Sequence, residues 1–394
     1  MRLCYVAVIS SRLGLSGASP RRFGHSDRSS SVCLASGIMR ILQLAPIWET
    51  VPPPGYGGTE SVVSVLTEEL MRRGHDVRLC ASGDSQTDAE LFSVFDRSLR
   101  PAGLIDESLQ YSLIHVAKAL AEADDFDIIH NHNGPPSEIG MALSHMIHVP
   151  MLTTLHNQLT ADTRFIWSNY EGWYNTISRQ QVSMLPDLPN ASFAGVVHNA
   201  IDVESFPFRP EKDGYLLFIG RITADKAPHL AVEAARRLGV KLILAGKVCI
   251  PEEQRYYRDV LAPMLDGKTA EFVGEADAAL KRELYAGAQA LLLPLAWDEL
   301  FGLVMIEAMA CGTPAVVFRR GAAPELVIDG ETGFVIDDVD GMVAALKRIE
   351  SIDPWRCREH VETYFGPGAL ADRYLAIYEK ILGVKEPVHD HVLA

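Results

Sequence analysis

The sequence predicts a protein of the α/β class, built from two halves that each contain a parallel sheet covered by helices. The chain has 394 residues, of which 48% are hydrophobic and 22% charged, and this is enough for two domains with separate cores. From Met39 onward, short β-branched or leucine-rich runs alternate with longer segments of helical periodicity, which is typical of parallel strands joined by helices. A charged segment with two prolines, residues 202–213, interrupts this alternation once and indicates a linker.

The first half, residues 39–207, opens with a strand pattern in "RILQLAP", then a loop rich in glycine and proline, then a helix pattern in "TESVVSVLTEELMRRG". Gly74 ends that helix, because glycine adopts the left-handed backbone conformation of a helix C-terminus at little cost. Four more runs have the composition of buried strands: "DVRLCAS", "FDIIHNH", "PMLTTLHN" and "AGVVHNA". We therefore expect five parallel strands in this half.

The second half, residues 208–365, repeats the pattern with six strand-like runs: "GYLLFIGR", "VKLILAGK", "TAEFVG", "AQALLLP", "TPAVVF" and "GFVID". Each half is thus Rossmann-like, and such sheets bind ligands beyond the carboxyl ends of their strands. Two such halves facing each other would form a cleft. Residues 366–385, with "GALADRYLAIYEKIL", form an amphipathic helix that we expect to cross back to the first half, and residues 386–394 are expected to be a tail.

Residues 1–38 show neither helical nor strand periodicity. Their short apolar start and their Arg- and Ser-rich continuation are compatible with a weak targeting signal. The alternative is a disordered extension or an artefact of start-site choice, and we favour it because Met39 opens the first clear strand pattern.

Charge and cysteine usage exclude several functions. The formal net charge of -15 argues against nucleic acid or an anionic membrane as the main partner, since phosphate polyanions attract Lys and Arg. The six cysteines form no CxxC pair, which suits reduced thiols better than disulfides or a zinc site. No apolar run reaches the roughly 20 residues of a membrane span. We expect a cytoplasmic protein, and peripheral membrane contact stays open.

Two candidate anion sites follow strands. Gly57 and Gly58 precede the first helix, where backbone N–H groups can approach an anion closely, although a plain tight turn also explains a glycine pair. Arg221 directly follows a strand, and Lys226 lies five residues further on. Two cations at a strand end suit a nucleotide diphosphate, and the alternative is a solvated lysine with an arginine at a helix end.

Two carboxylates flank the start of an apolar helix in "WDELFGLVMIEAMACGTP", residues 297–314. Glu299 lies in the preceding loop, and Glu307 lies roughly 7 to 8 Å along the helix axis. The free N–H groups near Gly302 and Leu303 can receive a phosphate. Burial of Glu307 among apolar residues requires a donor partner, and paired ribose hydroxyls would serve.

In their order along the chain, these motifs resemble the retaining glycosyltransferases of family 4, which have the GT-B fold. The likeness runs from about Met39 to Leu382 and is carried by "GGTE", "RRGHDV", "FDIIHNH", "TTLHN", "HNAID", "GRITADK", "LAGK", "EFVG", "EAMACGTP" and "PELVIDGETGFVI", together with the Glu-x7-Glu spacing of Glu299 and Glu307. Two positions depart from the pattern: Leu300 stands where proline is common, and Ala227 where glycine is usual.

The resemblance implies roles for these residues. Glu299 would hold hydroxyls of the donor sugar, Glu307 the ribose, and His156 would lie beside the donor sugar, although a core or capping histidine is the alternative. His130 and His132 would face the acceptor side, and we expect no bound metal or other cofactor because no third ligand is suitably spaced. The implied donor-binding residues are Gly57, Gly58, Arg221, Lys226, Glu299, Phe301, Gly302, Leu303 and Glu307, and the catalytic ones are His156, Arg221, Lys226 and Glu299.

The implied activity is transfer of a hexosyl group, with retention of configuration, from a nucleotide-diphosphate sugar to a hydroxyl of a sugar, lipid-linked or small-molecule acceptor. UDP-glucose is the first expectation for the donor and GDP-mannose the second. Two alternatives are a UDP-sugar epimerase of the same shape and a non-catalytic sugar-nucleotide-binding protein. The acceptor side would be built by loops of the first half, and four aromatic residues of one such loop either stack on a sugar or pack the domain: Trp167, Tyr170, Trp173 and Tyr174.

Overall fold

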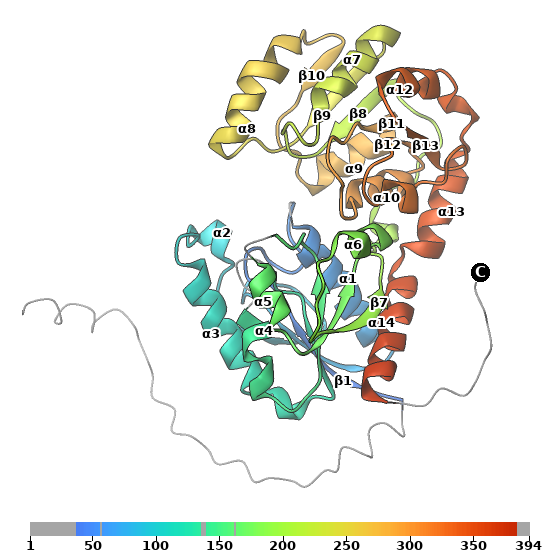
Figure 1. The fold of residues 1–394 in the computed structure, drawn as a ribbon. Helices are drawn as coiled ribbons and strands as arrows, with labels where there is room; N and C mark the ends of the chain where they lie inside the picture. Colours follow the sequence, from blue (N-terminus) through green and yellow to red (C-terminus); the bar gives the residue numbers. More distant parts are fainter. Residues whose placement is uncertain (1–36, 56, 135–138, 161–162, 384–394) are drawn as a thin grey trace, which may run out of the picture. The chain divides into compact units, whose positions relative to one another are not determined.

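The computed structural model describes residues 37–55, 57–134, 139–160 and 163–383. The expectation for residues 1–38 therefore lies almost entirely outside the described residues. The same holds for the tail that we expect after residue 385. The remainder, from Ile38 onward, is one compact unit that contains two parallel sheets (Figure 1).

The first sheet has seven strands in the order β3-β2-β1-β4-β5-β6-β7, and all of its neighbouring pairs are parallel. Its strands are β1 (Arg40–Leu44), β2 (Asp76–Cys80), β3 (Glu90–Phe92), β4 (Ile128–Asn131), β5 (Met151–Leu155), β6 (Trp173–Thr176) and β7 (Ser192–Val196). The accompanying helices are α1 (Gly58–Arg72), α2 (Leu99–Ala102), α3 (Ser108–Leu120), α4 (Ile139–Leu143), α5 (Arg164–Ser168) and α6 (Arg179–Met184).

Five of these strands are those that the sequence predicts, whereas β3 and β6 were missed. Strand β6 lies in the aromatic segment that the sequence predicts as a loop, with sugar stacking and domain packing as the two alternatives for its side chains. The side chains of Trp167, Tyr170 and Tyr174 are buried in the core of this half, so the packing alternative is correct for them. The ring of Trp173 lies 5.8 Å from the ammonium of Lys380, and it also packs against the interior.

The second sheet has six strands in the order β10-β9-β8-β11-β12-β13, again all parallel. The strands are β8 (Tyr215–Ile219), β9 (Lys241–Ala245), β10 (Ala270–Phe272), β11 (Ala288–Leu293), β12 (Ala315–Phe318) and β13 (Gly333–Ile336). The helices are α7 (Pro228–Leu238), α8 (Pro251–Tyr256), α9 (Ala278–Gly287), α10 (Leu303–Ala310), α11 (Ala323–Leu326), α12 (Val339–Leu346) and α13 (Pro354–Tyr364). All six predicted strands are present.

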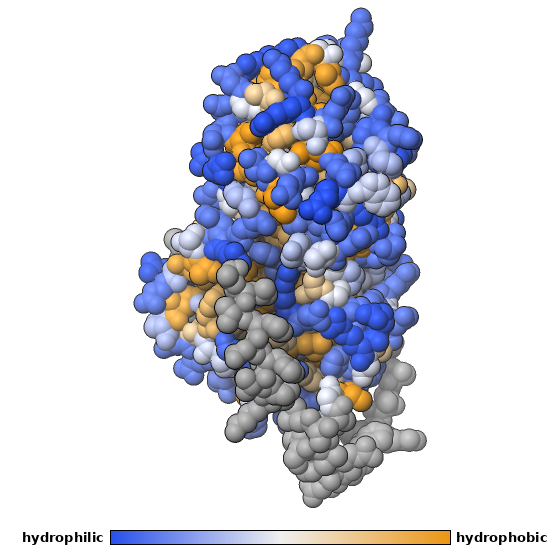
Figure 2. Space-filling model, turned by 90° about the vertical axis from the view of Figure 1, so that its right-hand side faces the viewer, coloured by the Kyte–Doolittle hydropathy of each residue, from blue (hydrophilic) through white to orange (hydrophobic). Residues whose placement is uncertain are grey.

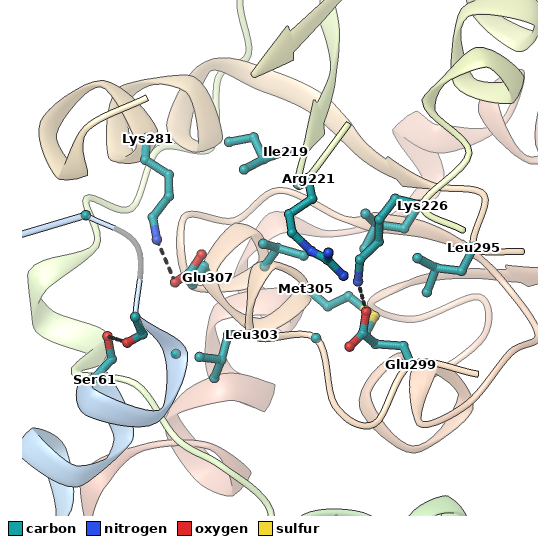
Figure 3. Close-up of a pocket in the computed structure, with 17 residues that line it drawn as sticks. Ser61, Ile219, Arg221, Lys226, Lys281, Leu295, Glu299, Leu303, Met305 and Glu307 are labelled. Carbon is teal, nitrogen blue, oxygen red and sulfur yellow. Dashed lines mark hydrogen bonds and ion pairs between the residues drawn. The ribbon is translucent and has the colours of Figure 1, made fainter. Parts of the chain in front are cut away.

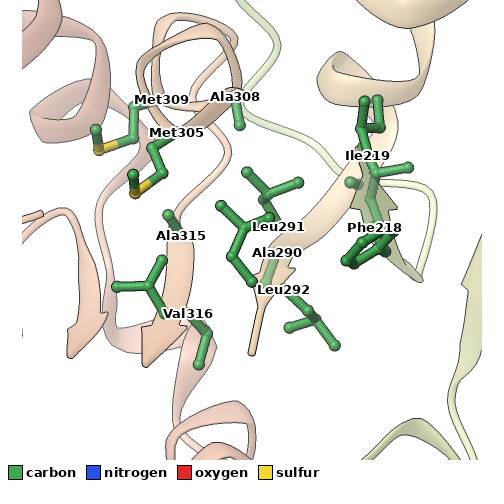
Figure 4. Close-up of a cluster of buried hydrophobic side chains, with 14 of the residues drawn as sticks. Phe218, Ile219, Ala290, Leu291, Leu292, Met305, Ala308, Met309, Ala315 and Val316 are labelled. Carbon is green, nitrogen blue, oxygen red and sulfur yellow. The ribbon is translucent and has the colours of Figure 1, made fainter. Parts of the chain in front are cut away.

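Helix α10 is held against the centre of this second sheet by apolar contacts. Met305, Ala308 and Met309 belong to the same buried cluster as Leu291 of β11 and Ala315 of β12 (Figure 4). The side chains of these five residues are fully buried. Burial of this kind is the main favourable term in folding, so the position of the helix, and of the loop before it, is firmly set.

The last helix, α14 (Pro367–Leu382), packs on the first half although it follows the second half in sequence (Figure 1). Leu370, Tyr374 and Tyr378 are buried in the same cluster as Val62 and Leu66 of α1. The Arg73 guanidinium donates to the Asp372 carboxylate at 2.5 Å and adds a polar tie between the same two helices. The expected return of the C-terminal helix to the first half is confirmed.

Hydrophilic residues predominate on the face that Figure 2 shows, and the hydrophobic ones form separate patches between them. None of the helices in the described ranges combines the length and the apolar character that a membrane-spanning segment needs.

Candidate functional site: a pocket between two helix N-termini

A pocket of about 290 Å³ is lined by residues of both halves (Figure 3). Its walls come from the start of α1, the end of β8, the loop before α10 and α10 itself, with one lysine from α9. The lining residues are Gly55, Gly57, Gly58, Ser61, Ile219, Gly220, Arg221, Lys226, Lys281, Leu293, Leu295, Glu299, Gly302, Leu303, Val304, Met305 and Glu307. We call this the donor pocket.

The N-terminus of α10 opens into the donor pocket. Gly302 precedes the helix with a φ of 89°, and no side chain caps the first turn. This backbone conformation favours glycine, and a Cβ at Gly302 would lie 2.6 Å from Cε of Met305, so the Met305 side chain would have to move. The uncapped N–H groups and the helix dipole make this end a suitable place for an anion.

The N-terminus of α1 faces the same pocket from the first half. Gly57 has a φ of 147°, and a Cβ there would lie 2.8 Å from Pro53. Gly58 begins the helix, and a Cβ there would touch Leu303 at 3.4 Å. Gly57 and Gly58 line the pocket together with Gly302 and Leu303, so two positive helix ends lie at one pocket.

Lys226 and Glu299 form an ion pair within the donor pocket (Figure 3). Both side chains are largely buried, with 15% and 14% of their surface exposed. The Lys226 ammonium also lies 5.0 Å from the centre of the Trp297 ring. The sequence predicts that Lys226 binds the diphosphate and that Glu299 binds the sugar, and the structure places the two side chains in direct contact.

Arg221 makes weaker contacts with its neighbouring carboxylates than Lys226 does. Its guanidinium lies 3.8 Å from Asp225 and 3.7 Å from Glu253, and 39% of its side chain is exposed. These long contacts are weak compared with a direct charged hydrogen bond. The group can therefore turn toward an anionic ligand at little cost.

Glu307 lies inside α10, as expected, and its exposed fraction is 7%. The sequence required a donor for this buried carboxylate, and the structure supplies two: Lys281 donates to Oε1 at 2.9 Å, and Tyr285 donates to Oε2 at 2.7 Å. Burial, reinforced by the neighbouring carboxylate, raises the pKa of the Tyr285 hydroxyl well above its usual value, so it stays a donor. Both partners lie on α9.

Phe301 does not line the donor pocket, although the sequence placed it among the donor-binding residues. Its side chain is buried in the core of the second half, where its ring centre lies 6.1 Å from that of Phe365 and 5.9 Å from that of His198. Packing of Phe301 anchors the loop that carries Glu299 rather than exposing an aromatic face to the pocket.

A second pocket, of about 360 Å³, adjoins the first and shares Gly57 and Gly58 with it. We call it the acceptor-side pocket. It is lined by Pro46, Trp48, Glu49, Gly57, Gly58, Thr59, Glu60, Arg100, His132, Gly134 and Asn157. Most of these residues follow strands of the first sheet or begin α1, so the pocket lies at the carboxyl edge of that sheet.

The charges of the acceptor-side pocket are two carboxylates and one guanidinium. Arg100 donates to Glu49 at 2.5 Å and lies 5.9 Å from the centre of the Trp48 ring. Burial raises the pKa of Glu49, an effect that Arg100 opposes. Burial also raises the pKa of Glu60 to about 7, so near neutral pH this carboxyl exchanges between its charged and uncharged forms.

The three predicted histidines occupy different places. His132 lines the acceptor-side pocket, and its Nδ1 lies 3.0 Å from Nε2 of the half-buried His156. His130 does not reach that pocket: its side chain is fully buried, with Tyr378 at 2.6 Å and Thr154 at 2.7 Å from its ring nitrogens. The expectation that His130 faces an acceptor is therefore not met, because α14 covers this part of the sheet.

No group of three His, Cys, Asp or Glu in the described ranges is arranged to hold a metal ion. Sequence reasoning missed Lys281, Tyr285 and Gln43, which hydrogen-bond to predicted site residues, and it also missed Glu49, Glu60 and Arg100 of the acceptor-side pocket. Gln43 did carry a signal, since it is an amide inside the otherwise apolar strand "RILQL". Lys281 and Tyr285 carried none, because surface-type lysines and tyrosines are ordinary in a helix.

Comparison with known proteins agrees with both halves of this architecture. A family model described as Glycosyltransferase Family 4 matches residues 56–188, and one described as Glycosyl transferases group 1 matches residues 202–361. The chain is 26% identical over 379 residues to the phosphatidyl-myo-inositol mannosyltransferase of Mycolicibacterium smegmatis, a match that covers 88% of this chain and 95% of the relative.

Solved structures show the same fold. A sucrose-phosphate synthase from Thermosynechococcus elongatus matches with a TM-score of 0.69 and 20% identity, covering 88% of this chain and 100% of that one. The Anabaena protein HepE, in complex with UDP-glucose, matches with a TM-score of 0.63 and 18% identity, again over 88% and 100%. The predicted two-domain α/β architecture of the GT-B type is thus confirmed, and with two family models matching its two halves in succession, this chain belongs to the group 1, family 4 glycosyltransferases.

Proposed function

We propose that this glycosyltransferase moves a glucosyl group from UDP-glucose, with GDP-mannose as the second candidate donor, to a hydroxyl of an uncharged polyol, with retention of configuration. The observation that carries the proposal is the donor pocket, where two helix N-termini and three cationic side chains lie beside two carboxylates. A nucleotide-diphosphate sugar has matching chemistry, since its anionic centre is flanked by two sets of hydroxyls.

The diphosphate would lie between the N-termini of α1 and α10, with Arg221 and Lys226 neutralising its charge. Glu307 would accept hydrogen bonds from the ribose, because Lys281 and Tyr285 each occupy only part of its acceptor capacity. Glu299 would accept hydroxyls of the sugar, and the neighbouring Lys226 would be close to the leaving phosphate. The UDP-glucose in the HepE complex supports the choice of donor, and the mannosyltransferase relative supports the second.

Retention is proposed without a covalent sugar–enzyme intermediate. Glu299 is paired with Lys226. The ion pair makes the carboxylate a weaker nucleophile, but the carboxylate can still accept hydrogen bonds from sugar hydroxyls. The acceptor hydroxyl would attack from the face that the phosphate leaves, and its proton would pass to that phosphate. The protein would then act through positioning and through stabilisation of the diphosphate charge.

The acceptor-side pocket supports an uncharged polyol as acceptor. A phosphorylated or carboxylated acceptor would meet Glu49 and Glu60, and the single guanidinium of Arg100 is already bound to Glu49. A sugar or cyclitol hydroxyl, by contrast, can donate to either carboxylate, and the partly exposed Trp48 offers an apolar face for the ring. A lipid-linked acceptor fits only if its uncharged sugar enters this pocket.

The test is a matrix of donors and acceptors. UDP-glucose and GDP-mannose would each be incubated with neutral sugars, myo-inositol, amino sugars and sugar phosphates, and the anomeric configuration of any product read by NMR. We expect an α-linked product from UDP-glucose with a neutral acceptor. An inverted product, or a preference for sugar phosphates, would contradict the proposal. Conversion of the donor sugar in the absence of acceptor would instead indicate an epimerase.

A further inference from the structure

We propose that a series of buried hydrogen bonds, from Asn175 of β6 to His156, fixes the tautomer of His156. In that tautomer Nε2 carries the proton, and Nδ1 can accept a hydrogen bond from a substrate hydroxyl. Gln43, His132 and Tyr378 are then positioning residues that act through His156. The inference rests on the proposed function, since it concerns how His156 meets a substrate, but the tautomer itself can be measured without any activity.

The hydrogen-bonded side chains lie on four neighbouring strands of the first sheet. Gln43 of β1 is paired in register with His130 of β4, and Thr154 of β5 is paired with Asn175 of β6. All four side chains are buried, and α14 covers this face of the sheet with Tyr378. Polar residues in such a place must satisfy one another, because water does not reach them.

The direction of the series of hydrogen bonds is set at Asn175. Its Nδ2 donates to the backbone carbonyl of Thr176 at 3.3 Å, and a carbonyl can only accept. The amide is therefore oriented so that Oδ1 faces the hydroxyl of Thr154, 2.7 Å away. Since Oδ1 is also only an acceptor, the single proton of the Thr154 hydroxyl points toward Asn175.

The next two hydrogen bonds follow from that assignment. Thr154 has already donated its proton, so its oxygen accepts from Nε2–H of His130 at 2.7 Å. A neutral imidazole has one N–H, so Nδ1 of His130 must be an acceptor, and the hydroxyl of Tyr378 donates to it at 2.6 Å. Burial, with the nearby His156 adding to it, lowers the pKa of His130 well below its usual value, which keeps the ring neutral.

The last three steps lead to His132, which lines the acceptor-side pocket, and then to His156, which is not among the lining residues of either pocket but is hydrogen-bonded to His132. The Tyr378 oxygen accepts from Nε2 of Gln43 at 3.4 Å, so Oε1 of Gln43 accepts from Nε2–H of His132 at 2.8 Å. Burial also lowers the pKa of His132, so its Nδ1 carries no proton and accepts. The donor to that nitrogen must be Nε2–H of His156, 3.0 Å away.

His156 thus has its Nε2 occupied and its Nδ1 unprotonated. No hydrogen bond to Nδ1 occurs among the described residues, which leaves this nitrogen available. Burial lowers the pKa of His156 to about 4, so at neutral pH the ring accepts a hydrogen bond without becoming charged. Because the Gln43 amide neither gains nor loses a proton near neutral pH, the series of hydrogen bonds cannot conduct protons. It can only orient His156.

The first experiment measures the tautomer directly. Protein with ¹⁵N-labelled histidine would be studied by long-range ¹H–¹⁵N correlation at pH 7, with His156→Asn used to assign the signals. We expect His156 to show a protonated Nε2 and an unprotonated Nδ1. A protonated Nδ1, or an equal mixture of tautomers in the unaltered protein, would overturn the proposal whatever the protein catalyses.

The second experiment removes one hydrogen bond of the series and uses a matched control on the same helix. Tyr378→Phe removes the link between His130 and Gln43. Tyr374→Phe removes an equally buried hydroxyl that lies 3.1 Å from Thr154 and 3.4 Å from Nδ2 of Asn175. It leaves the bond from Asn175 to the Thr176 carbonyl and every later hydrogen bond of the series in place. We expect Tyr378→Phe to give a mixture of His156 tautomers and to lower kcat for UDP release from UDP-glucose roughly tenfold or more, with KM unchanged. Tyr374→Phe should keep the His156 tautomer and kcat.

The outcomes separate this inference from the proposed function. If His156 shows the expected tautomer but UDP-glucose is not turned over, the proposed donor chemistry fails and the series of hydrogen bonds stands. If UDP-glucose is turned over and both tyrosine variants lower kcat alike, the effect comes from helix packing, and the positioning role of Tyr378 is wrong.

Discussion

The ammonium of Lys281 lies 2.9 Å from Oε1 of Glu307, so the carboxylate proposed to receive a ribose already has a charged partner from the neighbouring helix α9. The pair holds the carboxylate in a fixed direction within the donor pocket. A ligand that uses Glu307 therefore meets a positioned acceptor rather than a mobile one.

The first prediction concerns this carboxylate. Glu307→Gln should weaken binding of UDP by about 1 to 3 kcal/mol, because hydrogen bonds to a charged group are lost. Binding of 2′,3′-dideoxy-UDP should scarcely change, since it has no hydroxyls to donate. Calorimetry with both nucleotides measures the difference. Equal losses for the two nucleotides would mean that Glu307 does not contact the ribose and serves α9–α10 packing instead.

The second prediction concerns the coupled pair Lys226 and Glu299. Lys226→Ala should weaken UDP binding for two reasons: it removes a cation, and it leaves an unpaired carboxylate near the diphosphate. Adding Glu299→Gln should restore part of the lost affinity. Glu299→Gln alone should leave UDP binding nearly as before and slow sugar transfer.

Arg221 supplies the control for that double-mutant cycle. Its nearest carboxylates are Asp225 and Glu253, so Arg221→Ala should weaken UDP binding by the same factor with or without Glu299→Gln. The idea of a shared phosphate site is refuted if neither cation variant alters the affinity measured by calorimetry.

A third prediction compares two glycines with similar backbone conformations. Gly302 and Gly330 have φ angles of 89° and 82°, but a Cβ at Gly302 would meet Met305 and Glu299, whereas a Cβ at Gly330 would meet nothing within 4 Å. Each change to alanine should lower the free energy of unfolding by roughly 1 to 2 kcal/mol through the strained backbone. Only Gly302→Ala should also weaken UDP binding, because it moves the start of α10. Denaturant unfolding and calorimetry on both variants provide the test.

The fourth prediction is a loss of stability in acid. Burial lowers the pKa of His115 and of His156 to about 4, and it lowers those of His130 and His132 as well. The unfolded chain binds these protons near pH 6.5, whereas the folded chain does not until the pH is much lower. Stability is therefore present above pH 6.5 and is lost as the pH falls, by about 2 kcal/mol at pH 5 for His115 and the same for His156.

Glu60 acts in the opposite direction and supplies the control. Its pKa of about 7 lies above the usual carboxyl value, so the folded state holds a proton that the unfolded state releases, and stability falls as the pH rises from 5 to 7. Glu60→Gln removes this compensation. Urea unfolding at pH 5 and pH 7 should show a steeper loss of stability in acid for Glu60→Gln than for the unaltered chain. A flat profile in both would contradict the buried neutral histidines.

Local signals explain the elements that the sequence predicts well. Most strands of the second half are compact apolar runs next to glycine, proline or charged residues, and all six predicted strands are found. Strand β6 was missed because Asn175 and Thr176 are polar, as in a loop. They are buried there because Asn175 bonds to Thr154 and to the backbone of Thr176, which no local pattern reveals.

The histidines show the same limit at the site. His130 and His132 end one strand two residues apart and look equivalent in the sequence, yet only His132 lines a pocket. The difference comes from Tyr378, 248 residues away from His130, which covers it when α14 packs against the first half.

By itself the sequence determined the two α/β halves, the positions of Glu299, Arg221 and Lys226 in loops after strands, and the position of Glu307 inside a helix, because hydrophobic periodicity and glycine placement act over a few neighbouring residues. Only the tertiary structure decided which partners these groups have and which histidine faces a pocket. Apart from Arg221 and Asp225, which are four residues apart, the partners lie between 22 residues apart, for Tyr285 and Glu307, and 335 residues apart, for Gln43 and Tyr378, so packing brings them together.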